Sequence, residues 1–193
     1  MFRPLPAALP IERIAAGAVI ARIHRLTTSE PFFGPRPGGP PTHRFHDPRR
    51  EFRMCFLGEN ASASFVETFL RNPPVRIITR NELANHGVTT FRVLRDLRVV
   101  KLYDDGLARI GCTAEVTSSA APYDEPQQLS REVWAHRDEP DGIQYRCRHD
   151  NGLLAIALYD KAATALETVS SDNLVSDHVR LLTWRARYGF EIA

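Results

Sequence analysis

Long apolar runs are missing from the sequence, and the features of a secretory leader are missing as well. The longest apolar stretches, such as residues 153–159 (LLAIALY), are far shorter than the roughly 20 residues that a membrane-spanning helix needs. Pro4, Pro6 and Pro10, with charges at Glu12 and Arg13, interrupt what would have to be the apolar core of a signal peptide. We therefore expect a cytoplasmic protein without a membrane span.

Cysteine is also scarce. The three cysteines, Cys55, Cys112 and Cys147, are an odd number at wide spacings, which predicts neither a disulfide framework nor a paired-thiol zinc site. The seven histidines contain no helical His-Glu-x-x-His pair, which would be typical of a zinc-binding helix. We expect no bound metal.

Neither a strong charge excess nor a familiar nucleotide or hydrolase motif is present. The 25 basic residues nearly balance the 23 acidic ones, so no overall field attracts nucleic acid or an anionic membrane. The sequence lacks a phosphate loop ending in Gly-Lys-Ser or Gly-Lys-Thr, and it lacks a Gly-x-Ser-x-Gly elbow. A nucleic-acid binder stays open as an alternative only through the basic segment between Arg36 and Arg53.

The pattern of the chain predicts one domain over residues 1–193, of the α+β class, with a mixed or antiparallel sheet and flanking helices. The expected strands cover residues 18–26, 52–57, 75–78, 142–146, 153–159 and 190–193, the last as an edge strand that closes the sheet. The expected helices cover residues 11–16, 61–71, 125–137 and 176–187, with a helical turn at 81–85. Residues 89–103 are predicted to form a hairpin with Asp96 at its turn, and residues 142–159 a second hairpin.

Several local signals support these boundaries. Asn60 offers a side-chain oxygen that can cap the helix at 61–71, and residues 72–74 (NPP) end it. Val179, Leu182 and Ala186 are expected to lie on one side of the last helix. Residues 27–50 hold six prolines and three glycines, which predicts a long loop, and loops of this length in compact domains are usually functional.

The chemistry is predicted to lie in an arginine of this loop and a glutamate of the following helix. Arg44 stands in Thr-His-Arg-Phe-His-Asp-Pro, and Glu67 stands in Ala-Ser-Phe-Val-Glu-Thr-Phe. Together with other segments, this order resembles the RES-domain family. The matching segments are residues 23–25 (IHR), 44–45 (RF), 55–58 (CFLG), 64–68 (SFVET) and 141–148 (DGIQYRCR).

The resemblance implies an ADP-ribosyltransferase-like fold and a bacterial toxin that destroys NAD, neutralised by a helix-turn-helix antitoxin. NAD would then be a substrate, no cofactor is implied, and nucleic acid would be reached only through the antitoxin. The carry-over assigns Glu67, Arg44 and Cys147 to catalysis, and Arg44, Phe56, Arg25 and Tyr145 to substrate binding. A homo-oligomer is left open.

These residue types suit the cleavage of the nicotinamide–ribose bond. A carboxylate such as Glu67 can stabilise an oxocarbenium-like centre, and Arg44 offers paired donors to a pyrophosphate. Phe56 offers a face for the cationic nicotinamide, a contact of roughly 0.5 to 2 kcal/mol. The implied acceptor is water or phosphate, giving a glycohydrolase or a phosphorylase, and transfer of ADP-ribose to a protein is the related possibility.

Structural alternatives stand beside each assignment. Glu67 could form an exposed ion pair with Arg71, four residues later, and Arg44 could be a solvated loop residue. Phe56 and Cys147 stand where the family has a tyrosine and a serine, so a catalytically impaired nucleotide-binding protein is the second hypothesis. Cys147 could also be a free, half-buried thiol, or one whose pKa is lowered by its basic neighbours in residues 146–149.

Overall fold

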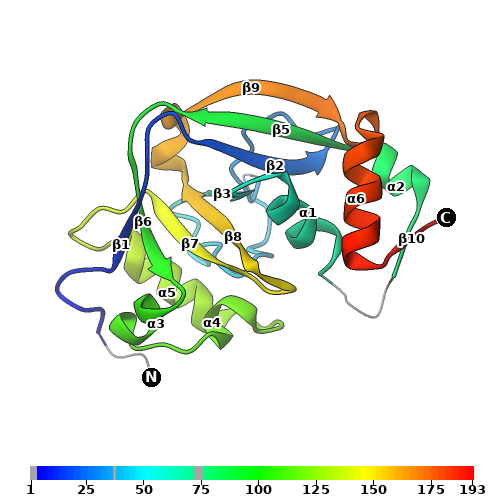
Figure 1. Cartoon of the computed structure of the whole chain (residues 1–193). Coiled ribbons are helices and arrows are strands. Elements are labelled where there is room, and N and C mark those ends of the chain that lie inside the picture. The colour runs from blue at the N-terminus through cyan, green and yellow to red at the C-terminus, as the bar shows by residue number, and fades with distance from the viewer. Residues whose placement is uncertain (1–3, 37, 72–75) are drawn as a thin grey trace.

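A computed structural model describes residues 4–36, 38–71 and 76–193, and it confirms the α+β class. An eight-stranded mixed sheet forms the framework, with helices packed around it (Figure 1). None of the helices in these ranges is long and apolar enough to cross a membrane.

The main sheet has the strand order β1-β6-β7-β8-β3-β2-β5-β9. Neighbouring strands run antiparallel except for the parallel pair β6 and β7. Its strands are β1 (Ile11–Ile14), β2 (Val19–Arg25), β3 (Met54–Gly58), β5 (His86–Val93), β6 (Leu97–Leu102), β7 (Gly142–Cys147), β8 (Asp150–Tyr159) and β9 (Leu166–Asn173). A second, two-stranded parallel sheet pairs β4 (Ile77–Ile78) with β10 (Glu191–Ile192).

The helices gather at the two ends of the sheet and over its middle. Figure 1 shows α3, α4 and α5 near the β6 and β7 strands, and α6 with α2 at the opposite end. The α-helices are α1 (Ala61–Phe69), α2 (Arg80–Ala84), α3 (Asp105–Ile110), α4 (Glu115–Ser118), α5 (Asp124–Trp134) and α6 (His178–Tyr188). Two 3₁₀-helices, η1 (Asp160–Ala165) and η2 (Leu174–Ser176), flank β9.

The sheet parts between β2 and β3, a junction that we call the seam. There the two strands share one residue pair, Ala21 with Gly58, whereas β2 pairs with β5 over seven residues and β3 with β8 over five. Where β2 and β3 diverge, their facing backbone groups are not paired with each other. The divergence leaves room between the two strands.

Helix α1 lies across the seam and contacts both β2 and β3. The Asn60 side chain caps it by accepting a hydrogen bond from the Ala63 backbone N–H at 3.0 Å, as the sequence predicted. The close approach depends on Gly58, where a Cβ would lie 2.5 Å from the Ser64 backbone nitrogen. The Ser64 hydroxyl then donates to the Ala21 carbonyl at 2.7 Å, which ties the helix to β2.

Several of the sequence predictions are confirmed. Strands cover most of residues 18–26 and 52–57, helices α1 and α5 cover most of 61–71 and 125–137, and β7 and β8 form the hairpin within 142–159. No regular element occurs in the described part of residues 27–50, apart from an isolated bridge between Gly34 and Met54. The end of the helix at residues 72–74 and the start of the strand at 75 lie outside the described residues.

Three predicted elements are wrong. Residues 11–14 form a strand, not a helix, because they pair with β6 along the edge of the sheet and are too few to hold a helix alone. Residues 89–103 are not a hairpin, because β5 pairs with β2 and β9 while β6 pairs with β1 and β7. Residues 191–192 do not close the main sheet but pair with β4.

Helix α6 packs on a different side from the one on which the sequence pattern grouped its apolar residues. Val179 and Leu182 are 76% and 59% exposed, and Leu181 and Trp184 face the core instead. The Trp184 ring stacks on Phe65 at 4.3 Å between centroids, and burying so large a ring decides which side of the helix packs. Four elements were not predicted from the sequence: η1, β9 and the short helices α3 and α4.

Candidate active site

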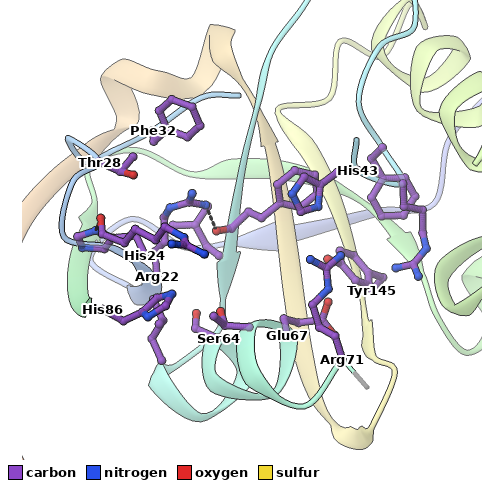
Figure 2. Close-up of a pocket in the computed structure, with 17 residues that line it drawn as sticks. Arg22, His24, Thr28, Phe32, His43, Ser64, Glu67, Arg71, His86 and Tyr145 are labelled. Atoms are coloured by element: carbon purple, nitrogen blue, oxygen red, sulfur yellow. Dashed lines mark hydrogen bonds between the residues drawn. The ribbon is translucent and has the colours of Figure 1, made fainter. Parts of the chain in front are cut away.

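A cavity of about 350 Å³ lies at the seam. Side chains reach it from β2, β3, α1 and β7 and from the proline-rich loop, as Figure 2 shows. The sequence-predicted residues Arg25, Arg44, Phe56, Glu67 and Tyr145 all line this cavity, and Cys147 does not. Segments more than 100 residues apart in the chain therefore meet at one place.

Glu67 stands on α1 at the edge of the cavity and is half-buried. Its Oε1 accepts a hydrogen bond from the Arg148 backbone N–H at 3.3 Å. No ion pair joins it to Arg71, although both residues lie in the described part of the chain and both line the cavity. The carboxylate is therefore held by the turn after β7, and it forms no ion pair with Arg71, which lies just beyond the end of α1.

Arg44 is half-buried as well and is not a solvated loop residue. Its Nη2 donates to the Ser119 carbonyl at 2.9 Å, and its Cζ lies 5.6 Å from the centre of the Tyr123 ring. Part of the guanidinium is thus used in holding the loop against the segment before α5, which leaves fewer N–H groups for a ligand.

Helix α5 fixes the loop that carries Arg44. The Gln127 amide donates to the Pro41 and His43 carbonyls, both at 3.1 Å, and the Ser130 hydroxyl donates to the Phe45 carbonyl at 2.9 Å. These two helix residues are three apart and so share one face. One side of α5 therefore replaces the backbone partners that the prolines deny the loop.

A second contact between α5 and the loop is ionic. Asp47 is fully buried, and its Oδ1 lies 3.2 Å from Arg131 Nη1. The same carboxylate accepts hydrogen bonds from the Arg49 and Glu51 backbone N–H groups. This side chain shapes the turn that follows Arg44.

Arg22 is a charged cavity residue that was not predicted from the sequence. It lies on β2, its Nη1 donates to the Phe56 carbonyl at 2.6 Å across the seam (dashed in Figure 2), and its Nε lies 2.9 Å from Glu30 Oε2. The available signal was its place in β2, two residues from the buried His24, which put both on one face of the strand. Arg25, predicted instead, lines the cavity from an exposed position.

Phe56 is packed against two histidines of the loop. The centre of its ring lies 4.8 Å from that of His43 and 5.5 Å from that of His46. Burial lowers the pKa of His43 to about 3, helped by His46 and by nearby arginines, and burial lowers the pKa of His46 to about 4. Both rings are neutral at neutral pH and form an aromatic wall with Phe56.

Tyr145 reaches the cavity from β7 with 3% of the residue exposed. Its ring meets Phe45 edge-on at 5.2 Å between centroids. Burial, and then the negative charge of Glu67, raises the pKa of the phenol well above its ordinary value. The hydroxyl therefore stays protonated and can donate a hydrogen bond.

Cys147 lies behind the cavity, fully buried, with its Sγ 3.8 Å from the Ala63 carbonyl of α1. Burial and the negative charge of Glu67 raise the pKa of the thiol, so the sequence-based suggestion that basic neighbours lower it is wrong. Desolvation outweighs the effect of exposed cations. A protonated thiol next to α1 can support the position of Glu67, but Cys147 is not among the residues that line the cavity.

The cavity as a whole is cationic. Arg22, Arg25, Arg44 and Arg71 line it, and the carboxylate among the lining residues is Glu67. Several guanidinium groups around a concave site favour an anionic ligand, because they match phosphate oxygens with paired donors. The described residues contain no group of three or more His, Cys, Asp or Glu side chains that could hold a metal ion.

Fold and site together define an α+β protein whose split sheet holds an arginine-lined cavity beneath a glutamate-bearing helix. The RES domain model matches residues 19–183, and the chain belongs to the RES domain family.

Two known proteins resemble the chain. It is 32% identical over 94 residues to the "Probable toxin y4kH" of Sinorhizobium fredii, an alignment that spans 49% of this chain and 72% of that protein. Its fold matches a chain in the crystal structure of the M. tuberculosis MbcT–MbcA toxin–antitoxin complex with a TM-score of 0.68 at 16% identity, over 90% of this chain and 92% of the other.

Proposed function

We propose that this protein is the toxin of a toxin–antitoxin pair and that it consumes NAD by cleaving the nicotinamide–ribose bond. The observation that carries the proposal is that Glu67 and the arginines Arg22 and Arg44 line one cavity. Membership of the RES domain family and the similarity to a protein described as a probable toxin support it.

The arginines would hold the pyrophosphate of NAD. Arg22 keeps N–H groups that are not used by Glu30 or the Phe56 carbonyl, and Arg44 keeps those not used by the Ser119 carbonyl. Guanidinium groups pair with phosphate oxygens in a fixed geometry, which also sets the direction of the dinucleotide. The cavity volume of about 350 Å³ is near the low end for ligand pockets, so the reactive half of NAD would lie inside and the other half toward the opening.

Glu67 would act on the ribose next to the bond that breaks. As nicotinamide leaves with the bonding electrons, positive charge develops on the ribose C1′ and ring oxygen, and a carboxylate stabilises that charge. The neutral Tyr145 phenol would donate a hydrogen bond in the same region. The rings of Phe56 and His43, which line the cavity, would offer their faces to the nicotinamide, with His46 packed against both.

The acceptor would be water or phosphate. Water adds its oxygen to C1′ and loses a proton, giving ADP-ribose. Phosphate adds an oxygen at the same carbon and gives ADP-ribose 1″-phosphate. Both routes release neutral nicotinamide, and transfer to a protein side chain would use the same centre.

The test is NAD consumption by the purified protein, followed as nicotinamide release, with mass analysis of the ADP-ribose product. Glu67→Gln is expected to lower turnover by at least about 100-fold with unchanged folding, and Glu82→Gln on the exposed surface of α2 is the matched control. Full retention of NAD at high enzyme concentration, with and without phosphate, would refute the proposal.

A second candidate is a nucleotide-binding protein without turnover. Phe56 offers no hydroxyl to the cavity, and Cys147 lies outside it. Thermal stabilisation by NAD without nicotinamide release would favour this candidate, and activity gained by Phe56→Tyr with Cys147→Ser would identify what was lost.

The partner would be a helix-turn-helix antitoxin that blocks the cavity, with the pair acting in the cytoplasm and reaching DNA only through the antitoxin. The structural similarity to a chain from a toxin–antitoxin complex supports a partner of this kind. Co-expression with the product of a neighbouring gene, followed by loss of NAD consumption in the purified complex, would test it.

A further inference from the structure

Glu30 is a buried carboxylate at the start of the proline-rich loop. Its side chain is 5% exposed and forms an ion pair with Arg22, which is 15% exposed, at 2.9 Å between Oε2 and Nε. Its Oε1 lies 3.7 Å from the Nδ1 of the buried His24. Taking two charges out of water is costly, so a buried pair of this kind calls for an explanation beyond stability.

The contacts around Arg22 restrain its guanidinium on three sides. Glu30 faces the Nε edge, the Phe56 carbonyl accepts from Nη1 at 2.6 Å, and the Phe32 ring centre lies 6.0 Å from Cζ. Glu30 also accepts a hydrogen bond from the Phe32 backbone N–H at 3.1 Å, which places that ring. An arginine has five N–H groups; among the described residues Nη2 has no hydrogen-bond partner, and Arg22 lines the cavity.

We propose that Glu30 is a positioning residue for Arg22. Its buried carboxylate holds the guanidinium across the seam, in the orientation that presents the free N–H groups to a phosphate in the cavity. Without this carboxylate the long arginine side chain regains several rotamers and its donors lose their fixed direction. The ligand class rests on the proposed function, whereas the orientation of Arg22 does not.

The direction in which removal of the Glu30 charge changes phosphate binding distinguishes a positioning role from simple charge repulsion. A carboxylate next to a phosphate site repels the ligand, so its removal alone would tighten the binding of an anion. Loss of a positioned donor weakens the same binding, because the paired hydrogen bonds to phosphate depend on geometry. Neutralising Glu30 without changing its size therefore gives opposite results under the two explanations.

The experiment compares wild type with Glu30→Gln, using ADP-ribose as the probe. The dissociation constant for ADP-ribose and the KM for NAD are expected to rise by about 10-fold to 100-fold, with a smaller change in kcat, since Arg22 would hold the pyrophosphate and not the bond that breaks. Glu167→Gln is the matched control: it removes a carboxylate from an exposed ion pair, in which Arg92 and Glu167 are 52% and 50% exposed, and it is expected to leave both constants unchanged.

A double-mutant cycle shows whether Glu30 acts through Arg22. In an Arg22→Gln background, Glu30→Gln is expected to leave ADP-ribose binding unchanged or to tighten it, because no guanidinium remains to be held. Equal weakening in both backgrounds would overturn the proposal, as would unchanged or tighter binding in Glu30→Gln alone. Wild-type protein that neither binds ADP-ribose nor consumes NAD would refute the proposed function separately.

The orientation itself can be checked without activity. A crystal structure of Glu30→Gln is expected to show the Arg22 side chain released from the Phe56 carbonyl. A guanidinium that keeps this hydrogen bond and its place in the cavity would overturn the proposal, whatever the enzyme does.

Discussion

Acidification is expected to destabilise this protein through two histidines: His43, which lines the candidate active site, and His46, which packs against His43. In an unfolded chain a histidine takes up a proton below its ordinary pKa of 6.5, whereas the folded protein lowers the pKa of His43 to about 3 and that of His46 to about 4. The unfolded state therefore binds more protons between these values, and the free energy of unfolding falls as the pH falls. Above pH 6.5 the two histidines are neutral in both states, and the free energy of unfolding has not yet been lowered by them.

The magnitude follows from the same values. Between pH 7 and pH 5 each histidine removes about 2 kcal/mol from the free energy of unfolding, or about 4 kcal/mol for the two. Most carboxylates stay ionised over this range, so the histidines dominate the change. Urea unfolding at pH 7, 6 and 5 measures it.

A variant isolates the contribution of one ring. His43→Phe keeps an aromatic side chain against Phe56 but cannot take up a proton, so its loss of stability from pH 7 to pH 5 is expected to be smaller than that of wild type by about 2 kcal/mol. His178→Gln, at the exposed start of α6, is the control and should behave as wild type. If His43→Phe and wild type lose the same stability, the idea that the cavity keeps His43 neutral is wrong.

Two further variants test how the site is held in place. Gly58→Ala would put a Cβ 2.5 Å from the Ser64 backbone nitrogen, so we expect a loss of about 1 to 3 kcal/mol in urea unfolding and a fall in NAD turnover as α1 and Glu67 move. Gly152→Ala meets only the flexible Asp150 side chain at 3.3 Å and serves as its control; equal effects would refute the argument. Asp47→Asn removes the buried charge that faces Arg131 and is expected to cost about 1 to 3 kcal/mol and to weaken NAD binding. Thermal unfolding and KM measure these two effects, and an unchanged KM would show that this turn does not position Arg44.

Local patterns in the sequence predicted the elements that depend on near neighbours. The Asn60 cap, the helix that carries Glu67 and the hairpin of β7 and β8 follow from residues a few positions apart. The proline-rich segment was recognisable as a loop for the same reason, since proline removes backbone donors wherever it stands.

The errors concern long-range pairing. Asp96 lies in the short connection between β5 and β6, as predicted, but these strands do not pair, and its carboxylate accepts a hydrogen bond from the Ala16 backbone N–H at 2.9 Å near the end of β1. Nothing near residues 89–103 shows that β5 and β6 lie in different parts of the sheet. The pairing of β10 with β4 depends likewise on a partner more than 100 residues away.

In the candidate site, too, local sequence signals were readable, whereas roles that depend on long-range contacts were not. The resemblance identified Arg44 and Glu67, whose neighbours in sequence are distinctive. Arg22 was missed because its role depends on Glu30 and on the parting of β2 from β3, which appear only when the chain is folded. The lowered pKa values of His43 and His46 also depend on how the folded loop buries these rings against Phe56, which no local pattern reports.

Because β2 and β3 share a single residue pair, a bound ligand is expected to stabilise the sheet at this junction. A molecule bound in the cavity would contact residues of both β2 and β3, because both strands line it. Occupied protein is therefore expected to exchange its amide hydrogens near β2 and β3 more slowly than empty protein. A ligand at this junction would then stabilise the sheet where its own strand pairing is weakest, between Ala21 and Gly58.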